Sequence, residues 1–170
     1  FTTQILATEN FPVNGSMKKR VNFWIKVYTE VKSNESIAHD VSDLSIVYKK
    51  VKTPKNRRTK NRLLKKEKCN IKKTILSIAK KNYVNLNKEE TRIAKIIGER
   101  TNKQLKELSK NFRFQGGLRD RYLVGLKRSY RYLDFIRKTI KSQGLPEELA
   151  YLPHVESSFN YKAYSKVGAA

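Results

Sequence analysis

The sequence predicts an all-α protein. Apolar residues recur at the three- and four-residue spacing of helix faces, two polar tetrads have the pattern of helix capping boxes, and no run of convincing length alternates as a strand does. Only 7 Gly and 4 Pro residues interrupt the 170, which argues against a sandwich or a low-complexity protein. We expect a helical N-terminal region over 1–112 and a second helical domain, incomplete at its C-terminus, over 113–170.

The N-terminal region is expected to begin with two short helices, over 18–29 and 41–51, joined by the polar residues 30–40. Apolar positions at helical spacing predict both helices: Val21, Trp24 or Ile25, and Tyr28 in the first, and Leu44, Val47 and Tyr48 in the second.

A basic segment follows, with thirteen Lys or Arg residues and a single acid, Glu67, between Lys49 and Lys73. Little of it is apolar and Pro54 interrupts it, so the pattern favours a solvated, partly disordered stretch at about 49–70. The alternative is an anion-binding arm. Few aromatic residues accompany the charges, so stacking on single-stranded bases has little support.

Three helices are predicted between the basic segment and residue 112. The first covers 71–83, and the other two start at capping boxes, Asn87–Glu90 and Thr101–Gln104. The apolar positions expected to be buried are Ile71, Ile75 and Ile78, then Ile93, Ile96 and Ile97 before Gly98, and finally Leu105 and Leu108.

The remaining helices lie between Gly116 and the C-terminus. The glycine pair Gly116–Gly117 is interpreted as a helix entry, Ser129 as the cap of the next helix, and Gly144 as its stop. Pro153 is expected to kink the last helix or to start its final turn afresh. The apolar faces are Leu118, Tyr122 and Leu126 in the first of these helices, and Leu133, Ile136 and Ile140 in the second.

The net charge of +23 implies an acidic partner, and nucleic acid, anionic lipid and a cell-wall polymer are the three candidates. Cys69 is the only cysteine, so no intrachain disulfide forms. His39 and His154 lack metal-ligand spacing and are interpreted as surface or packing residues; we expect neither a metal nor a cofactor. No apolar run has the length of a membrane span.

One carboxylate, Glu156, ends an apolar helical stripe made by Leu145, Leu149 and Leu152. Poor solvation and the negative end of a helix dipole both favour the protonated form of such a group, which a general acid for glycosidic cleavage requires. The alternative is a helix-end residue with its head in water. Glu148 lies about 12 Å away along an unbroken helix and is a poor second carboxylate.

The segment around Glu156 resembles the Glu-Ser motif of lytic transglycosylases. The matching residues are Glu156-Ser157-Ser158-Phe159-Asn160, then Ser165 and Gly168-Ala169-Ala170. The sequences 144–153 and 128–137 are similar to the membrane-bound lytic murein transglycosylase D branch. The resemblance is close over 112–170, and a looser one reaches back to Phe11-Pro12 and 21–25. It implies a lysozyme-like catalytic domain in the cell envelope, periplasmic or outer-membrane associated, although no export signal is visible.

The resemblance implies roles for individual residues. Glu156 is the acid and base that cleaves between N-acetylmuramic acid and N-acetylglucosamine and forms a 1,6-anhydro product. Ser157 supports the end of the catalytic helix, and Ser165 lies close to the carboxylate. Gly168 and Ala169 begin a loop toward the substrate. Alternatively, Ser157 and Ser158 cap the helix, Phe159 is core and Asn160 is a turn residue, and for the last two we prefer that interpretation.

The family pattern continues past these residues with Gly-Leu-Met/Trp-Gln and about a hundred further residues, whereas this chain stops at Ala170. We therefore expect the 170 residues alone to be inactive. The alternative functions are a non-catalytic cell-wall-binding protein with an incomplete cleft and, less favoured, a basic nucleic-acid-binding protein. For all of them the expected partner is anionic, with peptidoglycan glycan strands first and an anionic envelope surface second.

Overall fold

The computed structural model describes residues 10–163, and the chain divides into two compact units. Residues 14–117 form one, called the mixed unit below. The other contains Phe1–Val13 and Leu118–Ala170, and its described residues from 118 to 163 are called the helical unit.

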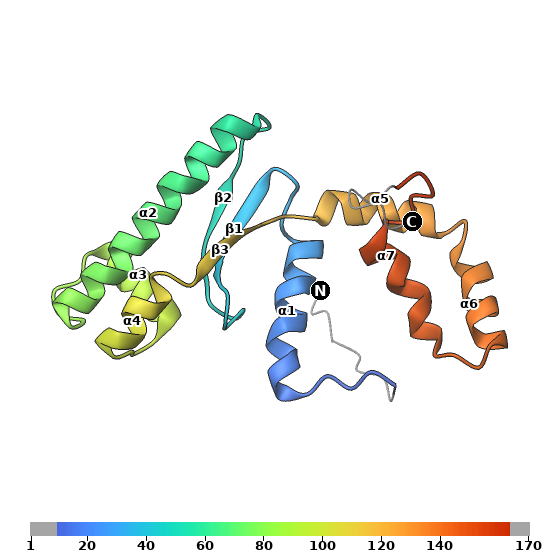
Figure 1. Cartoon of the computed structure of the whole chain (residues 1–170), viewed down its shortest axis with the longest axis horizontal. Helices are drawn as coiled ribbons and strands as arrows, with labels where there is room; N and C mark the ends of the chain where they lie inside the picture. Colours follow the sequence, from blue (N-terminus) through green and yellow to red (C-terminus); the bar gives the residue numbers. More distant parts are fainter. Residues whose placement is uncertain (1–9, 164–170) are drawn as a thin grey trace. The chain divides into compact units, whose positions relative to one another are not determined.

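The mixed unit contains a three-stranded antiparallel sheet, so the expectation of an all-α protein is wrong (Figure 1). The strand order is β2-β1-β3, and helices cover both faces of the sheet. The elements in chain order are α1 (Gly15–Thr29), β1 (Glu35–Asp40), β2 (Val47–Lys52), α2 (Arg57–Lys81), α3 (Lys88–Ile97), α4 (Asn102–Leu108) and β3 (Phe112–Gly116).

The central strand β1 replaces the polar connection expected over 30–40. All its residues after Glu35 are buried, because Ile37 and His39 face α1 while Ser36, Ala38 and Asp40 face the other side. A strand covered on both faces shows no alternation of polar and apolar residues, and alternation is the usual sequence signal of a strand.

The strand β2 stands where a helix was expected over 41–51. A bulge opposite Ala38 and His39 pairs these residues with Lys49 and Val47, so Tyr48 is an extra residue in β2. Tyr48 and Val51 are both buried, and with Leu44 and Val47 they reproduce the spacing of a helix face. The bulge therefore explains why the periodicity of this segment predicts the wrong element.

The helices α2, α3 and α4 pack together against one face of the sheet, with α1 on the other (Figure 1). Both predicted capping boxes are present, at Asn87–Glu90 and Thr101–Gln104. The predicted helix over 71–83 extends back to Arg57, capped by the Asn56 side chain, so most of the basic segment is helical. The core on this face consists of Ala38, Ile46, Tyr48, Ile71, Ile75, Ile78, Ala79, Ile93, Ile97, Leu105 and Phe112.

Glu90 connects α2 to the start of α3. Its carboxylate accepts hydrogen bonds from Lys81 Nζ at 2.7 Å, Ser77 Oγ at 2.6 Å and the Asn87 backbone N–H at 2.7 Å. These donors hold the pKa of the Glu90 carboxyl at about 2, because each favours the charged form. Glu90, the acidic member of the capping box of α3, thereby also fixes the end of α2.

The helical unit consists of α5 (Arg119–Ser129), α6 (Leu133–Ser142), the 3₁₀ helix η1 (Glu147–Tyr151) and α7 (Leu152–Glu156). Ser129 does not cap α6 as expected; its hydroxyl bonds to the Leu126 carbonyl at the end of α5. Gly144, with φ of +68°, follows α6 as predicted. Pro153 lies in the first turn of α7, so the chain restarts its helix there, one of the two outcomes expected.

Gly117 ends the sheet at a point of close backbone approach rather than opening a helix. A Cβ atom there would lie 2.2 Å from the Lys32 carbonyl oxygen and 2.3 Å from that of Val31. The Gly117 N–H also bonds to the Glu35 carbonyl at 3.0 Å, which holds the backbone in place. At neighbouring Gly116 a Cβ atom would meet nothing within 4 Å.

Replacing Gly117 with Ala should therefore destabilise the mixed unit by about 1–3 kcal/mol, as overpacking does. The matched control Gly116→Ala should leave the free energy of unfolding unchanged or raise it slightly, because alanine restricts the unfolded chain. Urea unfolding of both variants measures this difference. Equal stability of the two variants would show that the backbone around Val31 and Lys32 moves freely.

Candidate active site

Glu156 is the last residue of α7, and its side chain is exposed. Leu145 and Leu152 are 50% and 54% exposed, so the expected poorly solvated environment is absent from the described residues. The expected stripe also needs one continuous helix, whereas Pro146 precedes a 3₁₀ helix and a new α-helix begins at Leu152, with Pro153 in its first turn. Among the described residues, no side chain pairs with the Glu156 carboxylate.

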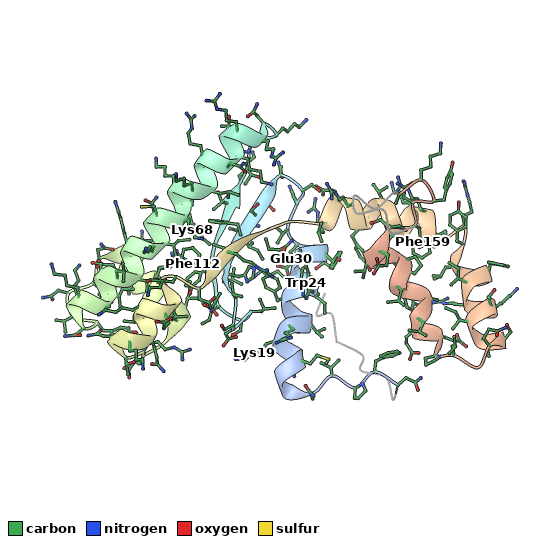
Figure 2. All side chains as sticks on the ribbon, in the orientation of Figure 1. Lys19, Trp24, Glu30, Lys68, Phe112 and Phe159 are labelled. Carbon is green, nitrogen blue, oxygen red and sulfur yellow. The ribbon has the colours of Figure 1, made fainter. Side chains whose placement is uncertain are left out.

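The chain turns sharply after Glu156. Ser158 and Phe159 both have φ of +53°, in the left-handed region that non-glycine residues rarely occupy. Such conformations cost about 1–3 kcal/mol each and persist only where the surroundings enforce them. Phe159, labelled in Figure 2, is 6% exposed and packs its ring against His154, which holds the turn in place.

One carbonyl group stabilises this turn. The Pro153 oxygen accepts the Ser157 N–H at 3.1 Å, the Phe159 N–H at 3.2 Å and the Ser157 hydroxyl at 3.5 Å. Ser157 therefore caps the end of α7 through its hydrogen bonds to the Pro153 carbonyl, and a catalytic role for it stays a prediction. Asn160 accepts the Lys162 N–H through its side chain, as a turn residue does.

His154 is the packing centre of the helical unit. Its ring lies 4.6 Å from Phe159, 5.4 Å from Tyr122 and 6.3 Å from Tyr151, measured between ring centroids. The ring of Tyr151 in turn lies under the Arg137 guanidinium, which also donates a hydrogen bond to the Tyr151 hydroxyl. These contacts link α5, α6, η1 and α7 two residues before Glu156.

The sequence predicted His154 as a surface or packing residue, and did not show that rings from α5, η1 and the turn after α7 all pack against it. The spacing of Tyr151 and His154, one helical turn apart, gave part of the signal, but the contact with Tyr122 of α5 depends on the tertiary fold. The His154 Nδ1 atom is buried without a hydrogen-bond partner among the described residues. Burial lowers the pKa of the imidazole, since the charged form is poorly solvated there.

A basic hollow of about 430 Å³ lies beside the turn, within the size range of ligand pockets. The last turns of α5 and the segment after Phe159 line it, and none of the described residues that line it is acidic. An anionic or carbohydrate group fits such a lining, because cations bind carboxylates and tyrosine rings present both apolar and polar surface. The lining residues are Val124, Lys127, Arg128, Arg131, Tyr132, Phe159, Asn160, Tyr161 and Lys162.

Three of the predicted site residues, Ser165, Gly168 and Ala169, lie outside the described residues. Within 10–163 the structure contains no group of three His, Cys, Asp or Glu side chains that could hold a metal ion. The same residues include no helix that is both long enough and apolar enough to cross a membrane.

The two histidines should titrate with midpoints below about 6.5, the value of a free imidazole. Burial lowers the pKa of both, and in His39 it outweighs the hydrogen bond to the Asp40 carbonyl, which opposes it. NMR titration of the imidazole C–H signals measures the midpoints, and His154→Phe assigns them. A midpoint for His154 above 6.5 would contradict the burial described here.

The same shift couples His154 to stability. The folded state disfavours the protonated ring while the unfolded chain accepts a proton below about 6.5, so the contribution of His154 is complete above that pH and is lost as the pH falls. The helical unit should therefore unfold at lower urea concentration at pH 5 than at pH 7, and His154→Phe should reduce that difference.

Comparisons of the chain with protein-family models, with curated proteins and with solved structures find no match to any of them.

Proposed function

We propose that this chain belongs to a peptidoglycan lytic transglycosylase that cleaves the β-1,4 bond between N-acetylmuramic acid and N-acetylglucosamine. The observation that carries the proposal is the spaced motif from Leu145 to Ala169, with Glu156 as its carboxylate. The reaction would take place in the cell envelope, on glycan strands.

The proposed reaction uses one carboxyl group twice. Protonated Glu156 gives its proton to the glycosidic oxygen as the bond from that oxygen to C1 of the muramoyl unit breaks. The resulting carboxylate then removes the proton of the C6 hydroxyl, and O6 bonds to C1. The product is 1,6-anhydro-N-acetylmuramic acid, and no water is consumed.

Three features of the helical unit support Glu156 as an accessible and positioned carboxylate. Its side chain is exposed at a helix end, where a glycan can reach it. The nearby acids Glu147 and Asp120 pair with Lys141 and Arg119, and Glu156 has no such cation among the described residues. The Pro153 carbonyl and the buried His154 ring fix the backbone on which it sits. A positioned acid–base group contributes about 10²–10⁴-fold to a rate.

The basic hollow supports the substrate class. Peptidoglycan carries carboxylates on its lactyl and peptide groups, and four cations, Lys127, Arg128, Arg131 and Lys162, line the hollow. Phe159 and Lys162, which line the hollow, follow Glu156 within six residues, so the turn after α7 connects the carboxylate to the hollow.

Replacing Glu156 with Gln in the intact protein should abolish anhydro-product formation while the fold and glycan binding are retained. Glutamine keeps the size and hydrogen-bonding head of the side chain but neither delivers nor accepts this proton. We expect a rate loss of about 10²–10⁴-fold or more, since one group performs both transfers. Mass spectrometry of digested peptidoglycan measures it, with anhydro products lighter by one water than hydrolysis products.

The control is Glu147→Gln, which removes only a surface ion pair of small energy, under about 1 kcal/mol. Activity that survives in Glu156→Gln and is lost in Glu147→Gln would exclude the assignment. Reducing-end muramic products would make the protein a hydrolase. Binding of peptidoglycan with no products from the wild-type protein would instead favour the non-catalytic wall-binding function.

Replacing Arg131 with Gln should weaken binding of peptide-bearing glycan by about tenfold, because a charge-assisted hydrogen bond to a carboxylate is lost. Glycan stripped of its peptides should bind the variant nearly as well as the wild type. The matched control is Arg121→Gln, on an exposed α5 residue that does not line the hollow. Equal losses for the two glycans would remove the hollow from the substrate site.

A further inference from the structure

The outer face of α2 carries an uncompensated stripe of positive charge. Ile71, Ile75, Ile78 and Ala79 are buried and define the face of α2 that meets the sheet. The basic residues at helical spacing on the opposite side are exposed, whereas Ser77, between Lys73 and Lys80 on that side, is half-buried and bonds to Glu90 of α3. The basic residues of this outer stripe are Arg58, Arg62, Lys65, Lys66, Lys73 and Lys80.

The outer stripe is long and straight. From Arg58 to Lys80 it runs about 33 Å along the helix axis. The single acid of α2, Glu67, faces the sheet and pairs with Lys49 of β2 at 2.8 Å, so it neutralises nothing on the outer stripe. Lys68 also lies on the sheet side, with its ammonium 5.8 Å from the Phe112 ring centre (Figure 2).

The start of α2 is charged against the helix dipole. Arg57 and Arg58 lie in the first turn, which contains no acid, although negative charge is favoured at this end. The first half of the helix, from Arg57 to Asn70, also contributes no buried residue. The exposed cations at the N-terminus of α2 are unfavourable in the isolated helix, and a bound anion would offset them. Local features that reduce stability in this way are typical of functional surfaces.

The shape and composition of the outer stripe favour a flat anionic surface over a polymer. Single-stranded nucleic acids are bound in grooves with stacking aromatic side chains, whereas the stripe lies on a convex helix and Arg57–Lys81 contains no aromatic residue. A plane meets the whole length of a straight helix. Leu76, 36% exposed, lies within the stripe between Lys73 and Lys80, where an apolar side chain enters a lipid headgroup layer.

We propose that the outer stripe of α2 docks the mixed unit on a membrane surface containing anionic phospholipids. Arg62, Lys66 and Lys73 lie along the middle of the stripe and would contact the phosphate groups. The docking is electrostatic and peripheral, with α2 lying parallel to the surface.

The test measures binding of the whole chain to vesicles of about one third phosphatidylglycerol in phosphatidylcholine by cosedimentation. The stripe variant combines Arg62→Gln, Lys66→Gln and Lys73→Gln, which keep good helix formers. The control variant combines Lys103→Gln, Lys106→Gln and Lys110→Gln, exposed residues in and after α4, and changes the net charge equally. Circular dichroism checks that both variants fold.

We expect the stripe variant to bind about 100-fold more weakly than the wild type, about fivefold for each basic residue removed from an anionic surface. The control variant should lose far less at physiological salt, where the Debye length is about 8 Å. The wild-type chain alone gives a second test, because its binding should disappear on vesicles of pure phosphatidylcholine.

Three outcomes would overturn the proposal. Equal losses in the two variants would show that net charge acts without the stripe. Undiminished binding to neutral vesicles would exclude an electrostatic mode. Tighter binding of duplex DNA or of soluble peptidoglycan fragments than of the anionic vesicles, with the same dependence on the stripe, would assign the surface to that polymer instead.

Discussion

A shortage of acidic side chains constrains the whole mixed unit. The protein has 38 Lys and Arg residues and 15 Asp and Glu residues. Several of those acids lie at junctions between elements: Glu90 joins α2 to α3, Glu67 joins α2 to β2, and Asp40 accepts the N–H groups of Ser42 and Asp43 after β1. Acids that hold elements together in this way do not offset the cations at the surface. The same few acidic residues therefore explain both the contacts between elements and the basic surface.

In the helical unit, Glu156 is exposed whereas His154, two residues before it, is buried among aromatic rings. The packing around His154 involves rings from α5, η1 and the turn after α7, and none of it reaches the Glu156 side chain. Among the described residues, the Glu156 carboxylate is therefore held on a fixed backbone without a cation to neutralise it.

The helices were predictable from sequence where local chemistry decides them. Asn87 and Thr101 each bond their own third residue, so their capping boxes form without reference to the rest of the chain. The strands were not predictable, because their form depends on distant partners. β1 is buried on both faces by helices from either side of it in sequence, and the bulge at Tyr48 is visible only once β1 lies alongside.

The candidate site was predictable in part. The restart of the helix near Pro153 was predictable because it depends on local sequence, whereas the role of Glu156 stays a prediction. The solvation of the Glu156 carboxylate was not predictable, because the expected apolar stripe would form only on one continuous helix. The ring cluster around His154 depends on Tyr122, far back in the chain, and could not be read from spacing alone.

The order of the sheet leaves β2 and β3 as its two edges, and both edges carry charge. β2 presents Lys49, Lys50 and Lys52, and β3 includes Arg113. An open strand edge is a template on which another chain can add, and charged side chains, lysine above all, are the common protection against it. An edge-to-edge approach of two copies would bring like charges on these strands together, which opposes pairing through the sheet.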